Sequence, residues 1–307
     1  MVKPSMVADL KEAYDACQRI TKAEAKNFYY AFRTLPFEKR RAIYAAYAYC
    51  RVCDDIADED EEMSSADKET RFAELRADLD SALNGGTSDP VLTALADASA
   101  RFGFTRELLI EVIEGVEMDL VKTRFANFDE LREYCYKVAS AVGLISIEIF
   151  GYDDPAAPEY AVDLGLAMQL TNIMRDVKED AERDRIYIPL DEMARFGYTE
   201  ADLKAGVVNE QFRSLMAFQA QRARAYFDSG AKLIPLLSAE SRACTGVLHA
   251  LYSTILDRIE GSGFDVFQRR VGLSSSEKLL LMARLWALSL FPRLPIPGRS
   301  SGRSSGR

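Results

Sequence analysis

Hydrophobic side chains recur along this chain with the spacing of an α-helix, and the strict alternation that predicts strands is almost absent. Gly and Pro gather at a few points typical of turns between helices. The clearest turns fall at 84–89, Gly103, 151–158, Pro189 and 261–263. No stretch resembles a long flexible linker, and no repeat recurs at a fixed period. We therefore predict a single all-α domain of about ten helices over residues 1–291.

The end of the chain differs in composition from the rest. From Pro292 the sequence is rich in proline and then becomes SGRSSGR, so we expect residues 292–307 to form a disordered basic tail. Residues 277–291 are strongly apolar, but this stretch is shorter than a membrane span and Arg284 lies in its middle. We expect a helix packed on the core, with contact to a membrane surface as the alternative.

Charge and cysteine content exclude several classes of function. The net charge is -9 and the sequence pI is about 5.0, so the protein repels a phosphate backbone and nucleic acid is not an expected partner. Five cysteines lie within helical sequence, which argues against a disulfide scaffold. Cys50 and Cys53 form a CxxC, but there is no second CxxC and His249 is the only histidine, so we interpret them as core thiols rather than zinc ligands. The N-terminus shows no secretory signal, and we expect a cytoplasmic protein.

A stripe of polar side chains follows one face of the helix predicted over 41–58. Tyr47, Arg51, Asp54 and Asp58 succeed one another at spacings of four, three and four residues, which puts them on the same face. Like charges one turn apart destabilise a helix by about 0.2–0.5 kcal/mol, so something positive should compensate Asp54 and Asp58. The rest of this helix is apolar, and we expect the stripe to line a cavity.

A second stripe lies on the apolar helix predicted over 163–185. Gln169, Asn172, Asp176 and Asp180 fall at spacings of three, four and four residues. Carboxylate and amide oxygens are ligands that Mg²⁺ prefers together with phosphate oxygens. Either aspartate pair alone is more typical of a solvated helix face than of a metal site. The two pairs together favour a site in which Mg²⁺, or alternatively Mn²⁺, grips a diphosphate.

Basic and aromatic residues near the two stripes fit such a substrate. Arg51, Arg175 and Arg185 can fork onto phosphate oxygens and stabilise a leaving diphosphate. Aromatic rings gather in the same helices, and ring faces stabilise a cation, although core packing is the default interpretation for each ring alone. No nucleophilic triad, Gly-rich phosphate loop or dinucleotide fingerprint is present. The rings are Phe28, Tyr29, Tyr30, Phe32, Tyr44, Tyr47, Tyr134 and Tyr136.

Four motifs in order resemble the squalene and phytoene synthase family. They are KNFYYAF at 26–32, YAYCRVCDDIAD at 47–58, YCYKVASAVG at 134–143 and QLTNIMRDVKEDAERDRIYIP at 169–189. The resemblance covers roughly residues 15–290. It implies an isoprenoid synthase fold with helices around a central active-site cavity. It also implies Mg²⁺-dependent head-to-head (1'-1) condensation of two prenyl diphosphates through a cyclopropylcarbinyl diphosphate.

The resemblance assigns roles to individual residues. The implied metal ligands are Asp54, Asp58, Asn172, Asp176, Glu179 and Asp180. The implied catalytic residues are Tyr47, Arg51, Tyr134 and Gln169. Substrate binding falls to Lys26, Phe28, Phe32, Ala139, Val142, Gly143, Arg175, Arg185, Tyr187, Tyr252 and Arg269, of which the small residues leave room for the alkyl chain. Family members often carry His and Ser where this chain has Glu24 and Asn27.

The product is less clearly indicated than the reaction. Bulky Phe32 and Tyr44 would shorten a tunnel, so we expect two farnesyl diphosphates to give presqualene diphosphate or a squalene-type product. NADPH would be needed only if the product is squalene. Two geranylgeranyl diphosphates giving phytoene is the alternative, and a non-catalytic helical assembly factor is an alternative of another class. A hydrocarbon product would be released at a membrane surface, where the protein could bind peripherally.

Overall fold

The structure is a computed structural model that describes residues 4–25, 28–58, 64–274, 276–278 and 280–281. Within these residues the chain is helical and forms no strand, so the predicted all-α fold is confirmed. The helices are α1 (Pro4–Glu24), α2 (Phe28–Phe32), α3 (Phe37–Asp58), α4 (Ser65–Leu83), α5 (Pro90–Phe102), α6 (Arg106–Val121), α7 (Phe128–Cys135), η1 (Tyr136–Ser140), α8 (Ala141–Phe150), α9 (Ala157–Arg175), α10 (Val177–Glu182), α11 (Leu190–Arg195), α12 (Glu200–Lys204), α13 (Glu210–Gly230), α14 (Leu233–Leu236) and α15 (Arg242–Gly261).

Side-chain caps mark several helix starts. The carboxylate of Asp89 accepts a hydrogen bond from the Leu92 amide at 2.8 Å, and Pro90 follows at the first helical position. Asn127 and Asn209 cap α7 and α13 in the same way. Of the helices in the described part of the chain, α2, η1, α10, α11, α12 and α14 have six residues or fewer. Such short helices carry too little periodicity to be predicted, which is why the sequence indicated fewer helices.

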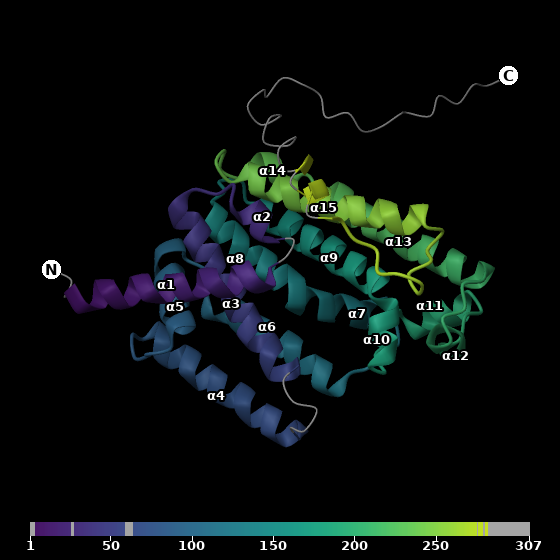
Figure 1. Ribbon diagram of the computed structural model, residues 1–307, viewed down its shortest axis with the longest axis horizontal. Helices are drawn as coiled ribbons and strands as arrows, with labels where there is room; N and C mark the ends of the chain where they lie inside the picture. Colours follow the sequence, from purple (N-terminus) through teal and green to yellow (C-terminus); the bar gives the residue numbers. More distant parts are fainter. Residues whose placement is uncertain (1–3, 26–27, 59–63, 275, 279, 282–307) are drawn as a thin grey trace.

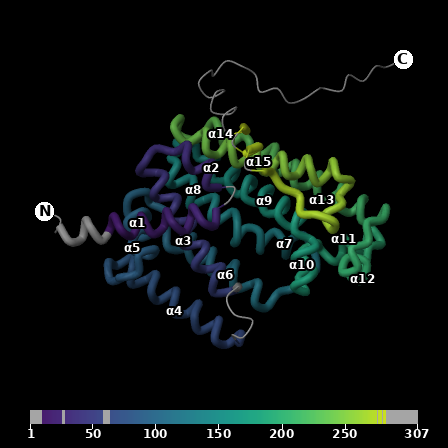
Figure 2. Tube along the Cα trace, viewed as in Figure 1, coloured from purple at the N-terminus to yellow at the C-terminus, as the bar shows by residue number. Residues whose placement is uncertain are grey.

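Helix α9 lies at the centre of the packing. It contacts α13, α15, α8, α7 and η1, and α3 contacts α1, α5, α6 and α8 (Figure 1). Helices α1 and α3–α6 fill the left and lower part of the view, and α11–α15 the upper and right part, with α2 beside α15 (Figure 2). The apolar flanks of α9 are almost completely buried, with Leu166 and Ala167 at 1% and 0% exposure. The second polar stripe is therefore carried by a helix that the core holds on several sides.

Two glycines allow the helices around α9 to approach closely. A Cβ added at Gly165 would lie 2.7 Å from the Cα of Ser140 in η1. A Cβ added at Gly230 of α13 would lie 2.8 Å from the Cα of Leu164 in α9. Both contacts are with backbone atoms, which cannot move aside as a flexible side chain could. Glycine at these two positions thus sets how near η1 and α13 come to α9.

The segment from α7 to α8 is a continuous helix with a π-helical turn, η1, in its middle. A π turn widens the helix locally and shifts the face on which later side chains lie. This turn begins at Tyr136, two residues after Tyr134, and packs against α9 and α6. The widened turn thus lies between Tyr134 and the small residues of α8.

Some sequence predictions fall at the end of the chain. The tail over 292–307 and most of the apolar stretch over 277–291 lie outside the described residues, so these predictions and the domain boundary remain predictions. No helix in the described residues is long and apolar enough to cross a membrane.

Replacing Gly165 or Gly230 by alanine tests the packing around α9. Each added methyl meets backbone, so we expect each variant to lose about 1–3 kcal/mol of unfolding free energy. Gly246 in α15 is the matched control, because a Cβ there meets nothing within 4 Å. Gly246→Ala should be neutral or more stable by about 0.5–1 kcal/mol, since alanine favours the helix. Urea unfolding followed by circular dichroism measures all three, and equal stability of all three variants would contradict the packing account.

Candidate active site

Helix α3 carries the first polar stripe into a cavity. Tyr47, Arg51 and Asp54 line this cavity, and Glu24 joins them from the end of α1. A guanidinium nitrogen of Arg51 lies 2.5 Å from Asp55 and another lies 3.9 Å from Asp54. Burial raises the pKa of Tyr47 to about 12, and the negative charge of Asp54 adds to the effect. The side chain of Asp58 lies outside the described residues.

The second stripe spans the junction of α9 and α10. Helix α9 ends at Arg175, Asp176 has φ -102° and ψ 14°, and α10 begins at Val177. The amide of Asp176 still donates to the Asn172 carbonyl at 2.9 Å, and the amide of Asp180 to the Asp176 carbonyl at 2.9 Å. The single helix predicted over 163–185 is thus interrupted at Asp176.

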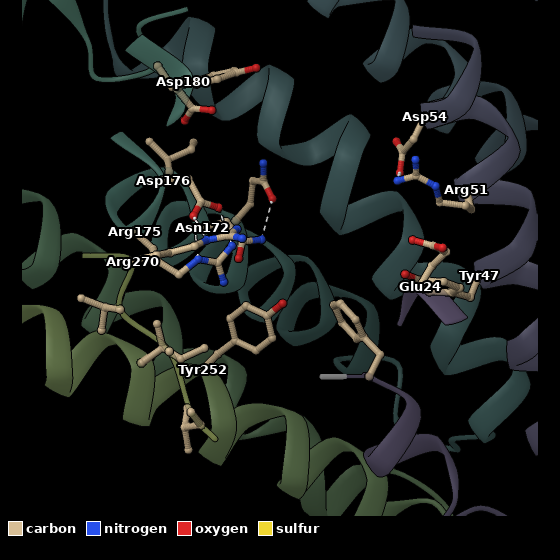
Figure 3. Close-up of a pocket in the computed structure, with 18 of the residues that line it drawn as sticks. Glu24, Tyr47, Arg51, Asp54, Asn172, Arg175, Asp176, Asp180, Tyr252 and Arg270 are labelled. Atoms are coloured by element: carbon tan, nitrogen blue, oxygen red, sulfur yellow. Dashed lines mark hydrogen bonds and ion pairs between the residues drawn. The ribbon is translucent and has the colours of Figure 1, made fainter. Parts of the chain in front are cut away.

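The two stripes face each other across one cavity of about 670 Å³. Figure 3 shows Glu24, Tyr47, Arg51 and Asp54 on one side and Asn172, Arg175, Asp176 and Asp180 on the other, with Tyr252 and Arg270 beside the second group. Gln169 also lines the cavity and accepts a hydrogen bond from the Asn172 amide nitrogen at 3.2 Å. Except for Asp58, whose side chain is not described, the structure therefore brings together the residues that periodicity placed on two separate helix faces.

Electrostatics differ between the two aspartates of the second stripe. Burial alone would raise the pKa of Asp176, but ion pairs with Arg175 and Arg270 outweigh it and hold this pKa below its usual value. The Arg270 Nε atom lies 2.9 Å from Asp176 Oδ1. Burial, followed by the charge of Asp176, raises the pKa of Asp180 to about 7, although Arg185 opposes the shift. A further positive charge beside Asp180 would relieve this repulsion.

Unsatisfied oxygens in the second stripe and beside it fit a hard cation. Asn172 Oδ1 and Glu179 Oε2 are buried and have no hydrogen-bond partner. Buried polar atoms are normally paired, and both atoms are oxygens of the kind that Mg²⁺ binds. No three acidic, histidine or cysteine side chains in the described part of the chain converge closely enough to hold a metal ion by themselves. The donor set fits ions that complete their coordination with substrate oxygens, as Mg²⁺ commonly does.

Aromatic side chains form the rest of the cavity wall. Tyr134, Tyr187, Phe28 and Tyr252 line it together with Tyr47. The ring of Phe28 lies 6.0 Å from Tyr47 and 5.9 Å from Tyr252, measured between ring centroids. Phe32 does not line the cavity and instead packs behind Phe28, at 6.0 Å between centroids. Phe32, predicted to line the substrate tunnel, is thus a buried core residue that supports Phe28 from outside the cavity.

The three small residues do not line the cavity. Ala139 lies in η1, and Val142 and Gly143 lie in α8. A Cβ on Gly143 would lie 3.1 Å from the Ala161 carbonyl oxygen of α9. Close contact between α8 and α9 explains the glycine without any need to make room for a substrate chain.

The basic residues predicted to bind substrate are placed unevenly. Arg175 lines the cavity, whereas Arg185 lies in a small recess beside it, shared with Asp180 and Tyr187. Arg185 donates to the Asp119 carbonyl at 3.2 Å. Arg269 is exposed and does not line the cavity, whereas its neighbour Arg270 does. Lys26 lies outside the described residues.

Sequence reasoning missed four residues near the site. Arg270 and Lys278 reach the cavity from the segment after α15, and Glu24 reaches it from α1. Asp119 bonds to the hydroxyls of Tyr134 and Tyr187 from α6. The double arginine at 269–270 was the only available signal for Arg270, and nothing in the spacing around Asp119 singles it out.

Comparisons with known proteins agree with this arrangement. The squalene/phytoene synthase family model matches residues 21–277. A phytoene synthase of Arthrospira platensis is 39% identical over 288 residues, which cover 90% of this chain and 93% of the relative. Phytoene synthase 2, chloroplastic, of Solanum lycopersicum is 39% identical over 298 residues, covering 95% and 96%.

Solved structures of squalene and dehydrosqualene synthases also match this chain, at lower sequence identity. A dehydrosqualene synthase in complex with ligand has a TM-score of 0.83 and 28% identity, covering 92% of this chain and 98% of that one. A squalene synthase from Alicyclobacillus acidocaldarius has a TM-score of 0.79 and 27% identity, covering 84% and 97%. Because the family model spans most of the chain and its relatives match along nearly its whole length, the chain belongs to the squalene/phytoene synthase family and is a prenyltransferase.

Proposed function

We propose that the protein condenses two geranylgeranyl diphosphates head to head to give phytoene, through a cyclopropylcarbinyl diphosphate and with Mg²⁺ as cofactor. The observation that carries the proposal is the cavity between two acidic stripes, with aromatic rings between them. Carboxylates on both sides cannot hold a diphosphate directly, since all these groups are negative. They can do so together with divalent cations, which fits the unpartnered oxygens of Asn172 and Glu179.

The choice of the twenty-carbon substrate has two supports. Relatives 39% identical to this chain are named phytoene synthases, whereas the neighbours named dehydrosqualene and squalene synthase are 28% and 27% identical. The sequence argument for the fifteen-carbon substrate relied on Phe32 and Tyr44 as blocking residues. Neither of them lines the cavity, and Tyr44 is only 3% exposed. The alternative product, phytoene, is therefore better supported than the squalene-type product.

Arginines and the two polar stripes would bind the leaving diphosphate and stabilise its negative charge. Arg51 lies on the α3 side of the cavity, and Arg175 and Arg270 lie on the other side. When bound, Mg²⁺ would be held by Asp54, Asp58, Asn172, Asp176 and Asp180, with Glu179 nearby, and would supply positive charge to the departing phosphate oxygens. The arginines add forked hydrogen bonds that strengthen as negative charge builds up on the diphosphate.

Aromatic rings stabilise the organic half of the substrate. Loss of diphosphate leaves an allylic cation, and ring faces attract a cation through their quadrupole. Tyr47, Tyr134 and Tyr187 supply such rings at the wall, and burial first of all raises the pKa of each. The phenols therefore remain neutral at physiological pH. Phe28 and Tyr252 complete the apolar wall and help to exclude water, which would otherwise quench the cation.

Asp176→Asn tests the assignment of the second stripe. The variant keeps the shape of the side chain but removes the charge, so we expect Mg²⁺-dependent pyrophosphate release to fall roughly 100-fold or more. Circular dichroism should show an unchanged helical spectrum. Asp191→Asn, at an exposed aspartate in the first turn of α11, is the control and should keep full activity. Retained activity in Asp176→Asn would remove Asp176 from the site.

Substrate choice is tested by incubating the enzyme with farnesyl or geranylgeranyl diphosphate and Mg²⁺, with and without NADPH. We expect phytoene from geranylgeranyl diphosphate, identified by mass spectrometry, and no effect of NADPH because this product needs no reductant. A thirty-carbon product formed faster from farnesyl diphosphate would instead support the squalene-type function. Absence of pyrophosphate release with both substrates would leave the assembly-factor alternative.

Arg270 and Arg269 form a matched pair of variants. Arg270 faces the cavity and bonds to Asp176, whereas Arg269 is exposed outside it. If Arg270 binds the diphosphate, Arg270→Gln should raise the KM for geranylgeranyl diphosphate roughly tenfold, because a charge-assisted hydrogen bond is lost. Arg269→Gln should change it less than about twofold. The reverse order in steady-state kinetics would restore the assignment made from the sequence.

A further inference from the structure

The carboxylate of Asp119, near the end of α6, binds two tyrosines of the cavity wall. The Tyr134 hydroxyl donates to Asp119 Oδ2 at 3.0 Å, and the Tyr187 hydroxyl donates to Oδ1 at 2.7 Å. Tyr134 comes from α7 and Tyr187 from the loop after α10, and both line the cavity. One side chain of α6 thus binds both α7 and the loop after α10, which lies 68 residues further along the chain. Backbone contact adds to this, since Arg185 donates to the Asp119 carbonyl at 3.2 Å.

Ring stacking and these hydrogen bonds together fix the two phenols. The Tyr134 and Tyr187 rings stack with centroids 5.2 Å apart and planes 29° apart. Phe125 packs on both, with centroid distances of 5.3 Å to Tyr134 and 5.6 Å to Tyr187. Stacking restrains the ring planes, and a bound hydroxyl restrains the direction in which each ring points. Loss of the Asp119 carboxylate would free the orientation of the two hydroxyls but leave the rings of Tyr134 and Tyr187 stacked.

Asp119 also changes the electronic character of the phenols. A hydroxyl that donates to a carboxylate becomes more electron-rich at oxygen, because hydrogen bonds in a poorly solvated site polarise their partners. An electron-rich ring attracts a nearby cation more strongly. Burial, supported by the negative charge of Asp119, raises the pKa of both tyrosines, so each keeps the proton that it donates.

We propose that Asp119 is a positioning residue for the condensation, which holds Tyr134 and Tyr187 at the cavity wall in the orientation that stabilises the allylic cation. This inference rests on the proposed function. It assigns Asp119 no contact with substrate. Its effect passes through the two hydroxyls, so it belongs to the cation-forming step more than to substrate binding.

Asp119→Asn tests the proposal in the full-length enzyme with geranylgeranyl diphosphate at saturating Mg²⁺. The amide is weaker as an acceptor, so kcat should fall roughly tenfold or more while KM changes less than about twofold. Asp97→Asn is the matched control. Asp97 accepts a hydrogen bond of 2.6 Å from the Tyr14 hydroxyl, and neither residue lines the cavity. This variant removes the same kind of interaction and should leave kcat unchanged.

A mutant cycle separates positioning from a general structural role. In a Tyr134→Phe/Tyr187→Phe background the hydroxyls are absent, so adding Asp119→Asn should lower kcat by less than about twofold. A loss in that background equal to the loss in wild type would overturn the proposal. An unchanged kcat for Asp119→Asn would also overturn it. So would a defect that is fully restored by Mg²⁺ above the concentration that saturates wild type, because that result identifies a metal ligand.

Folding and function controls complete the test. If the circular dichroism spectrum of Asp119→Asn differs from that of wild type, the proposal is tested instead on the two single tyrosine variants. A reduced kcat in Tyr134→Phe and Tyr187→Phe supports the proposal, and wild-type kcat in both overturns it. If wild-type enzyme releases no pyrophosphate, the proposed function itself has failed and this inference fails with it. An active wild type with an unaffected Asp119→Asn overturns the inference alone.

Discussion

Repulsion between buried carboxylates is the constraint on which the site depends. Asp176 and Asp180 lie one turn apart at the junction of α9 and α10, and burial together with the charge of Asp176 raises the pKa of Asp180 to about 7. Arg175 and Arg270 offset the charge of Asp176, yet buried oxygens of Asn172 and Glu179 have no hydrogen-bond partner. Such an arrangement is stabilised when cations enter. We therefore propose that the acidic stripe serves to bind a ligand and does not serve the stability of the fold.

The helical scaffold keeps this strained arrangement in place. Helix α9 is held by α13 on one side and by η1 on another, at distances that only glycine permits at Gly230 and Gly165. A rigid α9 fixes where Asn172 and Asp176 lie, and α3 fixes Asp54 opposite them. The close packing of α9 thus matters for the proposed metal binding. If α9 were packed more loosely, the carboxylates could move apart and reduce their repulsion without a metal ion.

Periodicity was a sound guide to the long helices and to the stripes on them. Spacings of three and four residues correctly put Asn172, Asp176 and Asp180 on one cavity-lining face, even though the helix is interrupted at Asp176. The family resemblance pointed to Arg269, whereas the structure places Arg270 at the cavity, in a non-helical segment where periodicity gives no guide. Small side chains were also ambiguous, because Gly143 serves helix packing and not the substrate cavity. Asp119 was missed since its partner Tyr187 is 68 residues away in sequence.

Binding of inorganic pyrophosphate is the most direct test of the central claim, that divalent cations link the two acidic stripes to a diphosphate. Calorimetric titration should be done with and without Mg²⁺, on wild type and on Asp176→Asn. Our account predicts that Mg²⁺ tightens pyrophosphate binding at least about tenfold in wild type, through bridging contacts that bare carboxylates cannot make. It predicts little such gain in Asp176→Asn. Equal affinity with and without Mg²⁺ in wild type would contradict it.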